Sequence, residues 1–131
     1  MKYGIYYAYW EKEWNGDYKY YIDKISKLGF DILEISCGAF SDYYTKDQEL
    51  IDIGKYAKEK GVTLTAGYGP HFNESLSSSE PNTQKQAISF WKETLRKLKL
   101  MDIHIVGGAL YGYWPVDYSK PFDKKRDLEN S

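Results

Sequence analysis

Short apolar runs alternate along the chain with longer segments in which apolar residues recur every three or four positions. The runs occupy residues 3–9, 30–36, 62–68 and 103–109, and each has the length of a buried strand. The longer segments have the spacing of amphipathic helices. The pattern predicts about four successive strand and helix units, an order typical of a parallel sheet with helices outside it.

The predicted helices have recognisable ends and apolar faces. The first begins near Asp17 and ends at Gly29, because glycine readily adopts the left-handed conformation that closes a helix. Thr45 and Gln48 have capping-box spacing and predict the start of the second helix, which ends before Gly61. The expected apolar faces consist of Tyr18, Tyr21, Ile22, Ile25 and Leu28, then Leu50, Ile53 and Ala57, then Ala87, Trp91, Leu95 and Leu98.

The end of the chain resembles the first turns of a fourth helix. Residues 123–131 carry Leu128 as their apolar anchor and no C-terminal cap, so we expect the chain to stop within that helix. Two architectures fit four such units: a doubly wound sheet complete at this length, or half of a (β/α)8 barrel, which needs about 250 residues. Residues 67–72 do not complete a GxGxxG phosphate motif. Periodicity leaves the choice open.

Composition narrows the classes of partner. The chain has 18 basic and 19 acidic residues and a net charge of -1, so we expect neither a nucleic acid nor a membrane as partner. Its 14 Tyr and 4 Trp suit sugar binding, although tyrosines also fill ordinary packing contacts. A single cysteine, Cys37, excludes an intrachain disulfide. The N-terminus matches no signal peptide, so the expected location is the cytoplasm.

Four strings carry a resemblance that decides the architecture. They are GIYYAYWEKEW at 4–14, KLGFDILEIS at 27–36, LTAGYGP at 64–70 and IVGGALYGYWPVDY at 105–118. In order and spacing they resemble the N-terminal half of the ketose 3-epimerase family, which comprises the D-psicose and D-tagatose 3-epimerases of the xylose-isomerase-like barrel group. The resemblance implies that residues 1–131 form the N-terminal half of a (β/α)8 TIM barrel domain.

The resemblance also implies a reaction. Such enzymes invert C3 of a free ketohexose by deprotonation and reprotonation through an enediolate, which a divalent metal, Mn²⁺ or Co²⁺, stabilises. The family's metal ligands and catalytic carboxylates lie in the C-terminal half, so this chain has no catalytic residue and no metal ligand. We expect the intact parent to be a homo-oligomeric isomerase and the 131-residue chain alone to be inactive.

What this half would supply is the wall of the sugar pocket, because residues at the carboxyl ends of barrel strands face the active site. By the resemblance, the substrate-binding residues are Tyr6, Trp14, Gly67, Ala109 and Trp114. The aromatic rings would pack against the sugar, and the two small residues would leave room for it.

Four other residues have weaker claims to a role in the site. Glu34 lies within an apolar strand, where its carboxylate either lines the mouth of the site or makes a structural hydrogen bond. His71 follows Gly-Pro in a loop, and His104 opens the fourth strand at the end away from catalysis. We assign neither histidine to a metal, and Cys37 is expected to be a buried thiol.

Two alternatives to the epimerase remain. In the first, the 131-residue chain functions by itself as a non-catalytic half-barrel that is completed by self-association, since an open sheet leaves edge groups unpaired. In the second, the barrel belongs to another sugar isomerase of the same group or to an endonuclease, because a fold does not fix the function. The near-neutral charge disfavours the nuclease.

Overall fold

The computed structural model describes residues 1–119 and 122–130, without the side chains of residues 41 and 42. These residues form two compact units. Unit 1 contains residues 1–67 and 95–106, and unit 2 contains residues 68–94 and those from 107 onward.

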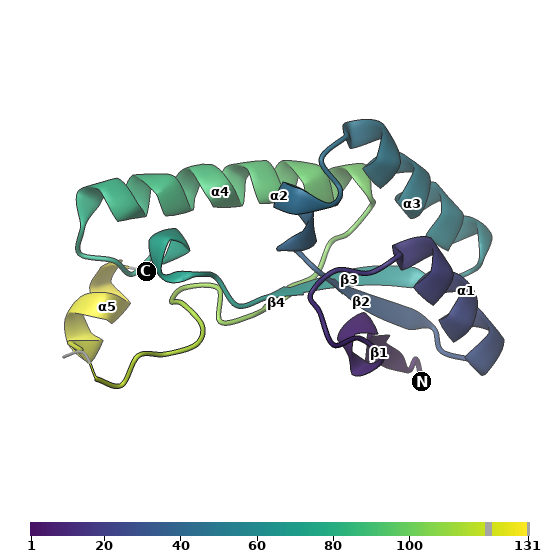
Figure 1. Ribbon diagram of the computed structural model, residues 1–131, viewed down its shortest axis with the longest axis horizontal. Coiled ribbons are helices and arrows are strands. Elements are labelled where there is room, and N and C mark those ends of the chain that lie inside the picture. The colour runs from purple at the N-terminus through teal and green to yellow at the C-terminus, as the bar shows by residue number, and fades with distance from the viewer. Residues whose placement is uncertain (120–121, 131) are drawn as a thin grey trace. The chain divides into compact units, whose positions relative to one another are not determined.

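Strands and helices alternate along the chain as the hydrophobic pattern predicts (Figure 1). The strands are β1 Gly4–Tyr6, β2 Ile32–Ser36, β3 Thr63–Tyr68 and β4 Val106–Gly108, and the sheet order is β1-β2-β3-β4. β1 pairs with β2, and β2 with β3, in parallel. The helices are α1 Tyr18–Leu28, α2 Ala39–Asp42, α3 Asp47–Glu59, α4 Pro81–Leu100 and α5 Lys124–Asn130, with 3-10 helices at Tyr7–Tyr9 and Phe72–Glu74.

The core of unit 1 lies between the sheet and helices α1 and α3, which pack against each other. The Asp17 carboxylate accepts a hydrogen bond from the Tyr20 N–H at 3.2 Å and so caps α1. Gly29 ends the helix with a φ of 82°, as the sequence predicts. The buried apolar side chains include Ile22, Ile25, Leu33, Ile35, Leu50, Ile53, Ala57, Leu64, Ala66, Leu98, Met101 and Ile103.

The predicted capping box at Thr45 and Gln48 is wrong. α3 begins one residue after Lys46, whose side chain makes no capping hydrogen bond. The Asp47 carboxylate instead receives two hydrogen bonds of 2.7 Å from the Arg96 guanidinium, and the Gln48 amide donates to Asp52 at 2.8 Å. The Gln48 side chain is therefore bound to Asp52, one helical turn further on, instead of serving as a cap.

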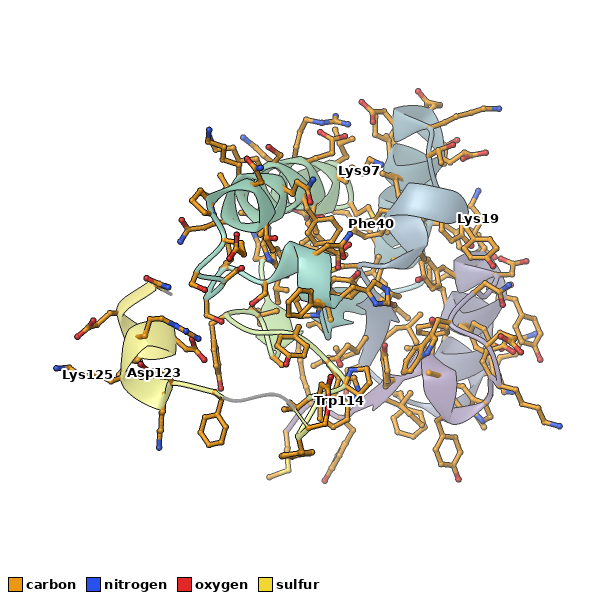
Figure 2. All side chains as sticks on the ribbon, turned by 60° about the vertical axis from the view of Figure 1, so that its left-hand side comes forward. Lys19, Phe40, Lys97, Trp114, Asp123 and Lys125 are labelled. Carbon is orange, nitrogen blue, oxygen red and sulfur yellow. The ribbon has the colours of Figure 1, made fainter. Side chains whose placement is uncertain are left out.

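Several other details of the fold differ from the expectation. The first strand ends at Tyr6, because residues 7–9 turn into a 3-10 helix. The fourth strand is limited to Val106–Gly108. Leu28 and Leu95, both assigned to the apolar faces of their helices, are 58% and 54% exposed, and α2 has no counterpart in the prediction. On the part of α4 that belongs to unit 1, Lys97 donates a 2.8 Å hydrogen bond to the Phe40 carbonyl (Figure 2).

Unit 2 is built around the Tyr68 ring. This ring stacks on Phe90 with centroids 5.3 Å apart and meets the edge of Trp91 at 6.1 Å. The loops after β3 and β4 are joined by a hydrogen bond from the Ser77 N–H to the Tyr111 carbonyl at 3.0 Å. The predicted helical start near the end of the chain is confirmed by α5. Within the described residues, no helix is long and apolar enough to cross a membrane.

Unit 1 should unfold at alkaline pH. Burial raises the pKa values of Tyr7 and Tyr18 above their ordinary value, and burial with the Glu11 hydrogen bond raises the pKa of Tyr21 to about 12. Below the ordinary tyrosine pKa of about 10, these three tyrosines are protonated in both the folded and the unfolded chain. Above it they ionise readily only in the unfolded chain, so the free energy of unfolding falls as pH rises.

Titration followed by circular dichroism and by tyrosinate absorbance tests this expectation. Exposed tyrosines should ionise first, and the buried ones together with the loss of helix. Gradual ionisation of every tyrosine while the helical signal stays intact would contradict it.

Candidate functional site

One face of the sheet in unit 1, called here the open face, carries the half-buried side chains of Tyr6 and Glu34 on β1 and β2. Leu33 and Ile35 are fully buried, whereas Glu34 between them is half-buried, because successive side chains of a strand point to opposite faces. Residues paired across a parallel sheet share a face, and the register pairs Tyr6 with Glu34 and Ser36 with Gly67. These side-chain positions therefore meet on one face of unit 1.

The Trp14 ring lies beside the Tyr6 ring, with centroids 6.3 Å apart and planes inclined at 40°. Trp14 is 67% exposed, yet its backbone is held firmly. The Tyr7 hydroxyl donates to the Trp14 carbonyl at 2.6 Å, and the Tyr44 hydroxyl donates to the Gly16 carbonyl at 2.6 Å. Tyrosine hydroxyls thus fix the loop that presents the exposed indole.

Replacing Tyr7 by phenylalanine should loosen this loop. The Trp14 carbonyl loses its donor, which is expected to lower the free energy of unfolding by about 1 kcal/mol, and sugar affinity should fall because Trp14 is less well positioned. Urea unfolding of the variant measures the first effect. Tyr20→Phe, a change at an exposed tyrosine, is the matched control, and equal midpoints for the two variants would refute the role of the Tyr7 hydroxyl.

Gly67 leaves the space that the Glu34 side chain occupies. A Cβ atom added at Gly67 would lie 2.7 Å from the Glu34 Oε1 atom and 3.3 Å from its Cδ atom, closer than van der Waals contact allows. Among the described residues, Glu34 has no hydrogen-bond or ion-pair partner. The structural hydrogen bond considered for Glu34 from the sequence is therefore not made among the described residues, and the carboxylate lies on the open face.

The electrostatics of this face keep its neighbouring groups protonated. Burial raises the pKa of Tyr6, a hydrogen bond with the Ser36 side chain partly offsets that rise, and the Glu34 charge adds to it. Burial, and then the Glu34 charge, raise the pKa of Cys37 to about 12 against the lowering effect of a backbone hydrogen bond. Cys37 is fully buried, which confirms the buried thiol, and Tyr6 offers a phenolic donor.

Unit 2 holds the other two predicted site residues, Ala109 and Trp114. Ala109 directly follows β4 and is half-buried. Trp114 is 61% exposed on the loop after β4 (Figure 2). Its backbone N–H donates to the Pro70 carbonyl at 2.7 Å. A Cβ atom at Gly69 would lie 2.8 Å from the Trp114 Cβ atom, so Gly69 permits this approach. Sugar contact by the five predicted residues stays a prediction.

The two histidines have structural partners. The backbone N–H of His71 and the Tyr68 hydroxyl both donate to the Glu74 Oε2 atom, at 2.8 Å and 2.7 Å. These bonds stabilise the loop after β3. His104 Nε2 lies 2.9 Å from Asp102 Oδ1 on the surface of unit 1. Among the described residues, no group of three or more His, Cys, Asp or Glu side chains is arranged to hold a metal ion.

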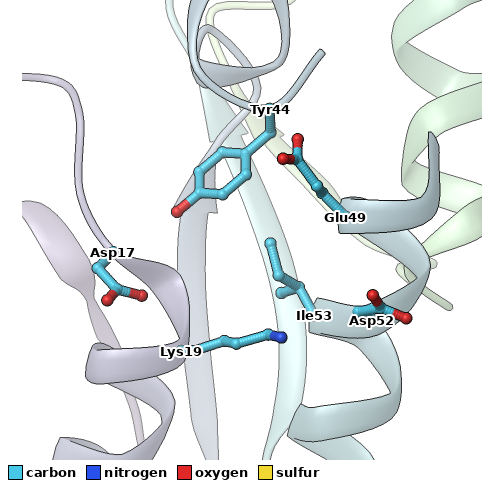
Figure 3. Close-up of a pocket in the computed structure, with 6 residues that line it drawn as sticks. All are labelled: Asp17, Lys19, Tyr44, Glu49, Asp52 and Ile53. Carbon is cyan, nitrogen blue, oxygen red and sulfur yellow. The ribbon is translucent and has the colours of Figure 1, made fainter. Parts of the chain in front are cut away.

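A cavity of about 190 Å³ lies between α1 and α3 (Figure 3). Its lining residues are Asp17, Lys19, Tyr44, Glu49, Asp52 and Ile53. Asp17 caps α1, Tyr44 holds Gly16, and Asp52 accepts from Gln48, so much of this lining already serves the structure. The open sheet face is the better candidate site.

The parallel βα units fit the predicted N-terminal half of a (β/α)8 barrel, and the comparison with solved structures confirms it. The structure superimposes on that of D-psicose 3-epimerase from Clostridium cellulolyticum H10, solved with D-tagatose, with a TM-score of 0.94 and 50% identity over 99% of this chain and 44% of that one. A D-psicose 3-epimerase crystallised in the presence of D-fructose gives 0.93 and 45% identity, over 99% of this chain and 44% of that one.

Sequence comparison finds a relative with the same name. The chain is 59% identical over 127 residues to the D-psicose 3-epimerase of Enterocloster bolteae, covering 97% of this chain and 42% of the relative. No model of a protein family matches the chain. The resemblance to the ketose 3-epimerases is therefore confirmed across nearly the whole chain, which spans less than half the length of these relatives.

Proposed function

We propose that the whole protein containing this chain is a ketose 3-epimerase, in which residues 1–131 form the N-terminal half of the barrel domain and part of the sugar-binding wall. The observation that carries the proposal is the 59% identity to a D-psicose 3-epimerase over 97% of the chain. Open strand ends bearing exposed aromatic rings support it, since such rings pack well against sugars.

The reaction divides into holding the sugar and moving a proton at C3. The C3 proton is weakly acidic, so the enediolate formed by its removal needs electrostatic stabilisation, the task of a divalent cation such as Mn²⁺ or Co²⁺. The described residues do not provide a ligand group for such a cation. We assign to this chain the holding step alone, and to other parts of the whole protein the groups that move the proton.

Each predicted site residue has a definite part in holding the sugar. The exposed rings of Trp14 and Trp114 would pack against C–H surfaces. Tyr6, kept protonated by its surroundings, would donate to or accept from a hydroxyl. Gly67 and Ala109 would keep the approach to the strand ends free. By the same resemblance we propose a cytoplasmic homo-oligomer acting on D-fructose, D-psicose or D-tagatose.

An activity assay tests this assignment. The whole protein, supplied with Mn²⁺ or Co²⁺, should convert D-fructose to D-psicose, or D-tagatose to its C3 epimer, as seen by chromatography, and chelation should abolish the conversion. Residues 1–131 alone should give none. Failure of the whole protein to form a C3 epimer from any ketohexose would overturn the proposal.

A further inference from the structure

Glu34 is the feature of unit 1 that the fold itself does not explain. It lies in β2, between β1 and β3, on the open face and half-buried. A partly desolvated carboxylate is costly unless donors reach it, and none of the described residues makes a hydrogen bond or ion pair with it.

The surroundings of Glu34 are shaped to leave its carboxylate free. Gly67 provides the space beside it. The Ser36 hydroxyl, next along the strand on this face, already accepts a hydrogen bond from the Gly38 N–H at 3.2 Å. Tyr6 is the residue paired with Glu34 across β1 and β2, and the negative charge of Glu34 contributes to raising the pKa of Tyr6. The part of the chain that the structure describes therefore holds the Glu34 carboxylate in place without giving it a hydrogen-bond donor.

We propose that Glu34 is a specificity-determining residue that accepts a hydrogen bond from a sugar hydroxyl on one of the non-reacting carbons, C4 to C6. This inference rests on the proposed function. An ionised carboxylate only accepts hydrogen bonds, and sugar hydroxyls donate them. Such charge-assisted bonds are stronger than neutral ones, so the protein would bind a ketohexose in preference to the analogue that lacks this hydroxyl.

The assignment to C4–C6 follows from the division of labour proposed above. The groups that act on C2 and C3 are assigned to other parts of the whole protein, so an acceptor on this chain is assigned to the carbons that do not react. We therefore infer that Glu34 holds the other end of the sugar. The Tyr6 and Trp14 rings, on the same unit, offer apolar surface for the carbons whose hydroxyls Glu34 would bind.

The test combines an isosteric substitution with substrate deletion. The whole protein and its Glu34→Gln variant are each assayed with D-fructose and with its 4-deoxy, 5-deoxy and 6-deoxy analogues, by KM and by calorimetric binding. Glu59→Gln, at an exposed position on α3, is the matched control. Thermal unfolding of all three proteins shows whether the substitutions disturb the fold.

Wild-type protein should bind one deoxy analogue about 10- to 100-fold more weakly than D-fructose, the range expected for a hydrogen bond to a charged group. Glu34→Gln should weaken D-fructose binding by a similar factor, largely erase that discrimination, and change KM far more than kcat.

Equal discrimination by wild type and Glu34→Gln against all three analogues would overturn the inference, as would a lowered unfolding temperature with unchanged KM, which would indicate a structural ion pair. An inactive wild type would instead refute the proposed epimerase.

Discussion

Replacing Gly108 by alanine is expected to unfold unit 2. Gly108 has a φ of 114°, a conformation strained for any residue with a side chain. A Cβ atom built there would lie 2.1 Å from the Tyr68 carbonyl oxygen and 3.0 Å from its carbon. Because these are backbone atoms within the unit's own core, rotation of a side chain cannot relieve the overlap.

The expected loss is about 4 kcal/mol or more, from backbone strain together with overpacking. This is a large share of the total stability of a domain, roughly 5–15 kcal/mol. Gly107→Ala is the matched control, because nothing lies within 4 Å of a Cβ atom at Gly107. Urea unfolding should separate the two variants clearly, and a Gly108→Ala protein within about 1 kcal/mol of wild type would contradict this packing.

Replacing Gly67 by alanine is expected to weaken the activity of the whole protein strongly while leaving the fold intact. The added methyl group would overlap Oε1 of Glu34 at 2.7 Å, an atom at the end of a flexible side chain that can rotate away. The free energy of unfolding should therefore change by less than about 1 kcal/mol. The displaced carboxylate would no longer meet the sugar, and a shift of about 1 Å in a binding group can lower kcat/KM roughly 100-fold.

A double-mutant cycle identifies the cause. In a Glu34→Ala background the overlapping carboxylate is absent, so adding Gly67→Ala should have little further effect on kcat/KM. If Gly67→Ala lowers kcat/KM by the same factor in both backgrounds, the two substitutions act independently and Gly67 does not act through Glu34.

Local sequence signals predicted the elements that local chemistry determines. Asp17 and Gly29 bracket α1 because a carboxylate cap and a left-handed glycine act within a few residues of the helix. The Thr45 and Gln48 signal failed, because α3 begins after Lys46 and the Gln48 amide donates to Asp52. The ion pair of Asp47 with Arg96, 49 positions away, was not visible in the sequence either.

The positions proposed for the candidate site came from the resemblance, whereas their arrangement came only from the structure. Resemblance pointed to Tyr6 and Gly67, while the reason for Gly67 depends on the parallel register that places it beside Glu34. The role of Tyr7 and Tyr44 in holding the Trp14 loop was also missed. The many tyrosines near that loop in the sequence were the available signal, but the groups to which their hydroxyls donate can be seen only in the folded chain.

The division of labour between holding the sugar and moving its proton can be tested most directly by isotope exchange. A ketohexose is incubated in D₂O with the metal-supplied whole protein and, separately, with residues 1–131, and the C3 position is followed by proton NMR. We expect the C3 proton signal to be lost with the whole protein and fully retained with residues 1–131 alone. Exchange catalysed by residues 1–131, or a whole protein that leaves C3 unexchanged, would contradict it.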